Sequence, residues 1–284
     1  MNSPSVSDHL KKLLFSRLDP QQATWFEGRL AVTLEPPSGR DLFLTYTLIG
    51  RKLPALGIEV PETPTEWLWS YLKGHGIRLD QLARIYLLAR ALERDPYYFV
   101  PKVGTLLQVA DTGELTTFLR FLPVLPHSEE FAAAAVDALR TNISTVFDAI
   151  ALENPFPEAH FDQGQWNQMY LKAAFMERDL LKIIGVEHRG NARLARIISD
   201  YAHERWAASR PVDPLIWRPV GPFLDESLLA DMRRLLESPD GREQRAGFLS
   251  CRASRDPRAA ALISGHPLRA VYDSKPFNWE DLKP

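Results

Sequence analysis

The sequence is poor in the features that place a protein outside the reducing interior of a cell. It has a single cysteine, Cys251, among 284 residues, which excludes a framework of internal disulfides and is consistent with a reducing compartment. Nowhere do 18 apolar residues follow one another, so no segment is expected to span a bilayer. No apolar stretch of signal-peptide length follows the N-terminus. Together these features predict a cytoplasmic protein.

Familiar catalytic and cofactor-binding motifs are also missing. Gly74-His75-Gly76 lacks the third glycine and the preceding strand of a dinucleotide-binding turn. His203-Glu204 begins a zinc-protease pattern, but Ala207 stands where the second histidine ligand belongs. We find neither a P-loop nor a nucleophile elbow, and the lone Cys251 is interpreted as a small core residue. We therefore predict no metal site and no cofactor, and leave open whether the protein is an enzyme.

Charge is balanced and spread along the chain. The formal net charge is −2, and the 34 Lys and Arg form no basic block interleaved with aromatics, so nucleic acid is not an expected partner. Hydrophobic residues make up 45% and charged residues 25% of the sequence, an ordinary globular mixture. A chain of this length can bury roughly 75% of its unfolded surface. We expect a folded protein with a substantial core.

Apolar residues recur with the period of an α-helix, and the alternation typical of strands is scarce. The clearest helices are 79–94, 128–138 behind an expected N-cap at Ser128, and 225–236 behind an expected N-cap at Asp225. Further helices are predicted at about 6–17, 20–34, 40–52, 65–73, 97–109, 113–121, 144–152, 163–177, 191–208 and 242–253.

The 22 prolines fall mostly between these stretches, which favours many short antiparallel helices joined by tight connections. We predict an all-α fold, an irregular α-solenoid or an array of stacked antiparallel helical hairpins. One helical-array domain is expected over residues 1–264. An extended tail over residues 265–284 is expected to pack on it through Tyr272, Phe277 and Trp279.

Two predicted helices carry polar residues where apolar ones are expected. The stretch from Trp166 to Met176 is apolar almost all round, which indicates a buried helix, yet it contains Asn167, Gln168 and Lys172. A buried polar group without a partner costs about 1–3 kcal/mol. These three side chains therefore need partners or a polar cavity.

In the second helix, 191–208, Arg205 falls in the middle of the apolar stripe, Asp200 and Glu204 lie at its margin, and His203 points away from it. These groups define a set of candidate ligand-binding residues: Asn167, Gln168, Lys172, Asp200, His203, Glu204, Arg205, Trp206, Arg210, Trp217 and Arg218. Two interpretations remain open. The set forms a cavity for an anionic head and an apolar tail, or Asp200 and Glu204 balance Lys172 and Arg205 in a structural ion network.

The same segments carry a family resemblance. Asn154-Pro155-Phe156-Pro157, Trp166-Asn167-Gln168-Met169, Asp200-Tyr201-Ala202-His203-Glu204-Arg205-Trp206 and Trp217-Arg218-Pro219 resemble the EboA family, most distinctively over residues 150–236. The resemblance implies a bacterial gene cluster that includes proteins similar to a prenyltransferase and a sugar-phosphate cyclase. It implies an association with making or moving a secondary metabolite, including export of a pigment precursor.

Two functions follow as hypotheses. The favoured one is a non-catalytic helical scaffold or carrier that binds a pathway enzyme or a hydrophobic intermediate. The alternative is an enzyme that acts on an anionic or prenylated pathway intermediate in a cavity between the 163–177 and 191–208 helices. Expected partners are other proteins of the same cluster or a hydrophobic or anionic small molecule, with no nucleic acid.

Overall fold

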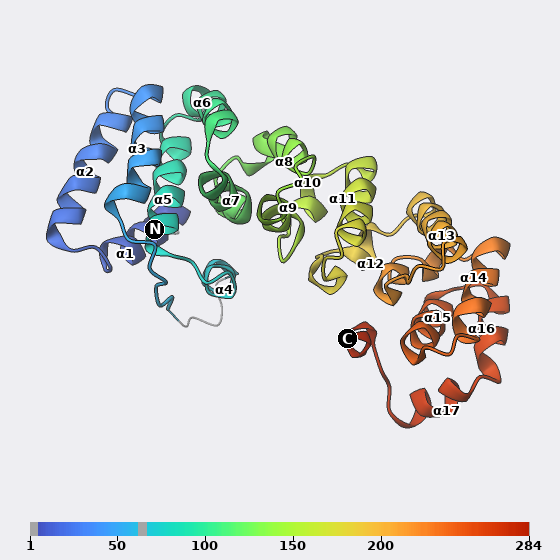
Figure 1. Ribbon diagram of the computed structural model, residues 1–284. Helices are drawn as coiled ribbons and strands as arrows, with labels where there is room; N and C mark the ends of the chain where they lie inside the picture. Colours follow the sequence, from blue (N-terminus) through green and yellow to red (C-terminus); the bar gives the residue numbers. More distant parts are fainter. Residues whose placement is uncertain (1–4, 62–66, 284) are drawn as a thin grey trace. The chain divides into compact units, whose positions relative to one another are not determined.

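The computed structural model describes residues 5–61 and 67–283 (Figure 1). Across these residues the regular secondary structure is helical, and pairing of extended chain is limited to isolated bridges between Leu34 and Pro37 and between Gly57 and Arg78. Helices pack against helices throughout. The predicted all-α class is confirmed. No helix in the described part of the chain combines the length and apolar character needed to cross a bilayer.

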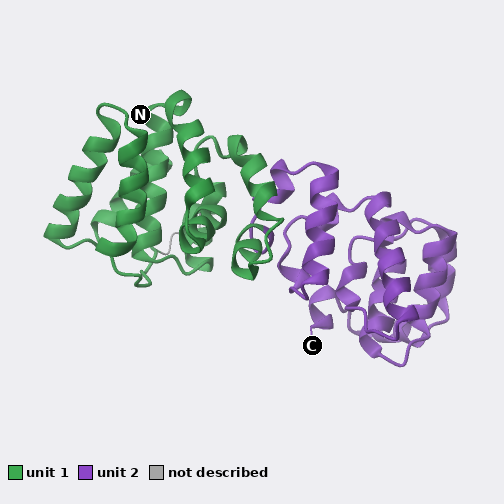
Figure 2. Ribbon diagram, turned by 45° about the horizontal axis from the view of Figure 1, so that its top comes forward, with its two compact units in different colours: residues 1–150 green, residues 151–284 purple. Residues whose placement is uncertain are grey.

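The chain divides into two compact units, residues 1–150 and residues 151–284 (Figure 2). The predicted helical-array domain of residues 1–264 thus contains the first unit and most of the second, and its unity stays a prediction.

The first unit is built around one central helix. Its elements are α1 (Val6–Phe15), α2 (Pro20–Leu34), α3 (Gly39–Lys52), α4 (Trp67–Gly74), α5 (Leu79–Arg94), α6 (Pro96–Val109), α7 (Thr112–Phe121), η1 (Leu122–Val124), η2 (Ser128–Phe131), α8 (Ala132–Ala138) and α9 (Ser144–Ala151). Helices α1, α2, α3, α6 and α7 all pack against α5 (Figure 1), and α5 is buried on nearly every face.

The second unit is organised around α15. Its elements are α10 (Phe156–His160), α11 (Gln163–Phe175), η3 (Leu180–Lys182), α12 (Val186–Arg189), α13 (Ala192–Ala207), η4 (Pro214–Trp217), η5 (Gly221–Phe223), α14 (Glu226–Leu236), α15 (Gly241–Ala253), α16 (Pro257–Ser264), α17 (Pro267–Ser274) and η6 (Trp279–Leu282). Close approach requires glycine twice here: an added Cβ at Gly221 would lie 2.5 Å from the Ser250 carbonyl oxygen, and one at Gly247 would lie 2.9 Å from Leu235 Cβ. Glycine therefore lets η5 and α14 reach the α15 backbone.

Helix starts follow the capping rules where a side chain can reach the free N–H groups of the first turn. The predicted N-cap at Asp225 is confirmed, since its carboxylate accepts from the Leu228 N–H at 3.0 Å. The predicted N-cap at Ser128 is wrong. His127 adopts a left-handed conformation (φ 55°) that turns the chain straight into the 3₁₀ turn η2, and α8 begins only at Ala132.

The C-terminal segment is not extended throughout. Residues 267–274 form α17, with Pro267 at the first helical position, where its missing N–H costs nothing. Two of the three aromatics expected to hold the tail contact Phe248, whose ring centroid lies 5.4 Å from that of Tyr272 and 5.5 Å from that of Phe277. Trp279 is half-buried, and its part in holding the tail stays a prediction. The predicted helix over 65–73 begins outside the described residues, and its described part forms α4.

Candidate functional site

Helix α11 is amphipathic rather than buried all round. Trp166, Met169 and Tyr170 are at most 1% exposed, whereas Gln168 is exposed and Phe175 is 66% exposed. The prediction of a helix buried on every face is therefore wrong on the side of Gln168 and Phe175. The sequence pattern did not reveal this exposed side, because Phe175 is apolar and is expected in the core. In the structure it packs edge-on against Tyr201, with ring centroids 4.9 Å apart.

Asn167 is the one predicted candidate on α11 that is fully buried, and it has a protein partner. Its amide exchanges two hydrogen bonds with Asn191: Asn191 Nδ2 donates to Asn167 Oδ1 at 2.8 Å, and Asn167 Nδ2 donates to Asn191 Oδ1 at 3.2 Å. Asn191 is also the N-cap of α13, accepting from the Leu194 N–H at 2.9 Å. The pair thus joins α11 to the start of α13 and satisfies a polar group that burial would otherwise penalise.

The charged candidates on α13 are mostly solvated. Asp200 and Glu204 are exposed and Arg205 is half-buried. Arg205 Nε donates to the Pro211 carbonyl oxygen at 2.9 Å. Arg205 lines a cavity of about 300 Å³, and the described lining of that cavity includes none of Asn167, Gln168 and Lys172. Lys172 is half-buried.

The structure does bring His203, Trp206 and Trp217 together. The rings of Trp206 and Trp217 stack with centroids 5.9 Å apart, the His203 ring lies 5.4 Å from Trp206, and the Arg234 guanidinium lies 4.3 Å from the Trp206 ring centroid. His203 Nε2 is 2.6 Å from Oδ1 of the buried Asp231 on α14. Asp231 Oδ2 accepts from Ser199 at 2.6 Å, so this aspartate ties α13 to α14.

The last two candidates also have local partners. Arg218 Nε donates to Glu187 at 2.7 Å, which joins the end of η4 to α12. Arg210 is exposed, and its backbone N–H donates to the Arg205 carbonyl oxygen at 2.8 Å. Ligand binding by this set of residues stays a prediction, and Asn167, His203 and Arg218 already have structural roles.

Sequence reasoning missed a buried ion cluster in the first unit. Arg84 and Asp80 on α5 are both buried and joined at 3.0 Å, and Arg84 Nε donates to the Tyr46 carbonyl oxygen at 3.2 Å. Arg84 Nη2 lies 3.9 Å from Oε1 of the buried Glu114, an atom that makes no hydrogen bond to a described residue. An i, i+4 Asp–Arg pair normally marks a solvated helix face, so only the apolar surroundings on α5 could have revealed it.

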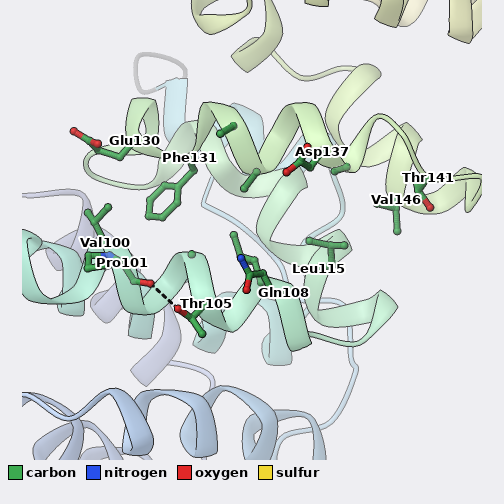
Figure 3. A pocket seen from close by; sticks show the side chains of 15 residues that line it. Val100, Pro101, Thr105, Gln108, Leu115, Glu130, Phe131, Asp137, Thr141 and Val146 are labelled. Carbon is green, nitrogen blue, oxygen red and sulfur yellow. Dashed lines mark hydrogen bonds between the residues drawn. The ribbon is translucent and has the colours of Figure 1, made fainter.

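A second missed feature is a groove in the first unit between α6 and α8, to whose lining Leu115 of α7 and Val146 of α9 also contribute (Figure 3). Its volume is about 590 Å³, within the range of roughly 300–1,000 Å³ typical of small-molecule sites. We call it the α6–α8 groove. Its lining is mostly apolar and comprises Val100, Pro101, Gly104, Thr105, Leu107, Gln108, Leu115, Glu130, Phe131, Ala133, Ala134, Asp137, Ala138, Thr141 and Val146.

The groove exists because one face of α6 packs on the core while its opposite face meets short side chains. Phe99, Val103 and Leu106 are buried. On the other face, a Cβ added at Gly104 would meet no atom within 4 Å, and α8 presents alanines such as Ala134, which is half-buried and lines the groove. Glycine and alanine in helices look ordinary in a sequence, so no local signal marks the space between them.

Comparison with known proteins identifies the family. The family model described as metabolite traffic protein EboA matches residues 6–221, more than half of the chain. The chain belongs to the EboA family. The resemblance to this family is confirmed, and the match covers residues 150–221 of the segment 150–236 from which it was drawn. Towards the N-terminus the match is wider, since it includes every residue of the α6–α8 groove. No curated protein and no solved structure matches the chain.

Proposed function

We propose that this EboA-family chain is a non-catalytic carrier that holds an apolar small molecule of its pathway in the α6–α8 groove. The observation that carries the proposal is a cavity of about 590 Å³ with a mostly apolar lining, inside the segment that matches the metabolite traffic family. Traffic requires a protein to shelter and release a molecule, and an apolar groove suits that task.

The polar groups of the α6–α8 groove suit retention better than chemistry. The Thr105 hydroxyl donates to the Pro101 carbonyl oxygen of its own helix at 3.0 Å (Figure 3). Asp137 is paired with Arg140 at 2.7 Å on the exposed side. A nucleophilic hydroxyl needs a base within hydrogen-bond reach, whereas Thr105 donates to a backbone carbonyl, and the carboxylate of Asp137 is already paired with Arg140.

The expected affinity is that of a carrier that releases its load. If a ligand buries roughly 300 Å² of apolar surface, the gain is about 7 kcal/mol before the cost of immobilising the ligand is subtracted. A gain of about 7 kcal/mol alone corresponds to a dissociation constant of about 10 μM, so the net dissociation constant lies above that value, towards the millimolar range.

Several finer expectations belong to this proposal. They are a role in secondary-metabolite biosynthesis, a cytoplasmic location and contact with proteins of the same gene cluster. The family description names metabolite traffic, with which the first of these is compatible. The alternative of an enzyme between α11 and α13 draws on the cavity beside Arg205, but the structural roles of Asn167 and His203 weaken it.

Titration with Nile red, an uncharged apolar dye, tests the carrier. We expect saturable fluorescence enhancement with one dye per chain. Gly104→Leu places a side chain in the open space of the α6–α8 groove and should weaken binding about tenfold. Gly28→Leu is the matched control, because Gly28 is an exposed glycine of α2 whose added Cβ also meets no atom within 4 Å. Equal affinity of Gly104→Leu and the parent would show that the dye binds elsewhere and that the groove carries nothing.

Native mass spectrometry of the protein purified together with its cluster neighbours complements the titration. A retained small molecule, lost in Gly104→Leu and kept in Gly28→Leu, is the expected result. A retained protein partner with no small molecule would favour the scaffold over the carrier.

A further inference from the structure

The ionisable side chains that line the α6–α8 groove are all of one sign. Of its fifteen lining residues, Glu130 and Asp137 carry carboxylates, and none is Lys, Arg or His. Both carboxylates belong to the wall formed by η2 and α8. Glu130 is exposed and its carboxylate points away from α6 at the outer edge of the groove (Figure 3), and the Asp137 side chain is 68% exposed. Glu130 lies near Phe131 at one end of the groove, and Asp137 lies towards Leu115 at the other (Figure 3).

We infer that the molecule held in the α6–α8 groove has an uncharged or cationic polar end and an apolar body. This inference rests on the proposed carrier function and specifies its ligand. An anionic end would lie near two exposed carboxylates, and like charges about 4 Å apart still repel by about 1 kcal/mol in water. An amine or hydroxyl meets carboxylate acceptors there instead.

The nearest cationic side chains do not cancel the negative charge of these two carboxylates. Arg140 pairs with Asp137 but does not line the groove, and 78% of its side chain is exposed. It therefore offsets the negative charge of Asp137 without providing a cationic contact inside the groove. Lys102 is on α6, but its Nζ lies 5.8 Å from the Tyr98 ring centroid and its stem contacts the position of Gly39. Glu130 has no comparable cation among the described residues, so it is the carboxylate expected to dominate.

Neutral polar contact is also provided. The Gln108 side chain extends from α6 towards the middle of the groove, between Thr105 and Leu115 (Figure 3). Its amide can both donate to and accept from a hydroxyl or carbonyl group. The apolar body of the ligand then lies against Val100 and Phe131. Long-chain alcohols and amines belong to this class, and fatty acids do not.

Displacement of bound Nile red by three ligands that share a ten-carbon chain tests the polar end. The ligands are decylamine, 1-decanol and decanoate, each kept below the concentration at which it forms micelles. We expect decylamine and 1-decanol to displace the dye, and decanoate to require severalfold more, since a repulsion of about 1 kcal/mol is roughly a fivefold difference. The difference between decylamine and decanoate should shrink as sodium chloride is raised, because salt screens exposed charges.

Glu130→Gln identifies the source of the preference. It should reduce the advantage of decylamine over decanoate by severalfold and leave 1-decanol unchanged. Glu27→Gln is the control, because it removes an exposed carboxylate of α2 that does not line the groove. The concentrations of decylamine, 1-decanol and decanoate that displace the dye should be the same for this variant as for the parent.

The outcomes separate the two proposals. If decanoate displaces the dye as well as decylamine does, and Glu130→Gln changes nothing, the charge inference is overturned. The carrier still stands in that case if Gly104→Leu weakens binding. If Nile red fails to bind, or binds Gly104→Leu as tightly as the parent, the carrier itself fails and the inference fails with it.

Discussion

Gly50 on α3 lies where the guanidinium of Arg84 passes close to the α3 backbone. A Cβ added at Gly50 would lie 2.5 Å from Arg84 Nη2. A free arginine could move aside, but this one is held by Asp80 and by the Tyr46 carbonyl oxygen in a buried position. The glycine is therefore explained by the ion cluster, and not by backbone freedom.

Gly50→Ala and Gly28→Ala form a matched test at this scale. Gly50→Ala should lower the free energy of unfolding by about 1–3 kcal/mol, because the added methyl group displaces the buried guanidinium. The better helix propensity of alanine offsets this loss by up to about 1 kcal/mol. Gly28→Ala should stabilise by about 0.5–1 kcal/mol, because an added Cβ there meets no atom. Urea denaturation gives both values. If the two variants shift the midpoint in the same direction by the same amount, the Arg84 position is wrong.

Helix α13 shows how an element depends on a partner that is distant in the sequence. Its N-cap, Asn191, is also the hydrogen-bond partner of Asn167, 24 residues earlier. Asn191→Ala should therefore lower the free energy of unfolding by about 1 kcal/mol through loss of the cap. It also leaves the buried Asn167 amide without its partner, which should cost about 1–3 kcal/mol more.

Asp19→Ala is the control for this element. Asp19 is the N-cap of α2 and its carboxylate accepts from the Gln22 N–H at 2.8 Å in an exposed turn, so only the cap term of about 1 kcal/mol should be lost. Thermal or urea unfolding compares the two variants. Equal destabilisation by Asn191→Ala and Asp19→Ala would mean that the amide pair contributes nothing to the stability of the second unit.

At the scale of the whole molecule, the carrier and the enzyme differ in what happens to the ligand. A carrier releases the molecule it was offered, so the mass recovered after denaturation of a loaded sample should be unchanged. Lys172 lies outside the α6–α8 groove, so Lys172→Met should bind Nile red with the parental affinity. Mass spectrometry of the released ligand and dye titration of the variant check both points. A changed mass that reverts to the offered mass in Lys172→Met would favour the enzyme between α11 and α13.

The sequence by itself determined most of the longer helices, many of their ends and the family, but not the short helices α10, α12, α16 and α17. Helical periodicity and capping are local, because they depend on residues three or four positions apart. They are therefore visible without knowledge of the partners of a helix, as the confirmed cap at Asp225 shows. The distinctive residues around Trp166 and Trp217 likewise pointed to the EboA family, which the match over residues 6–221 confirms.

Only the tertiary structure decided which helical faces meet and where space remains. Phe175 on helix α11 is apolar and exposed, whereas the ionic pair of Asp80 and Arg84 is buried. The α6–α8 groove arises from Gly104 on one helix and small residues on another. Burial and cavities depend on contacts between segments that no local pattern encodes, so the groove and its two carboxylates became visible only once α6 and α8 were placed side by side.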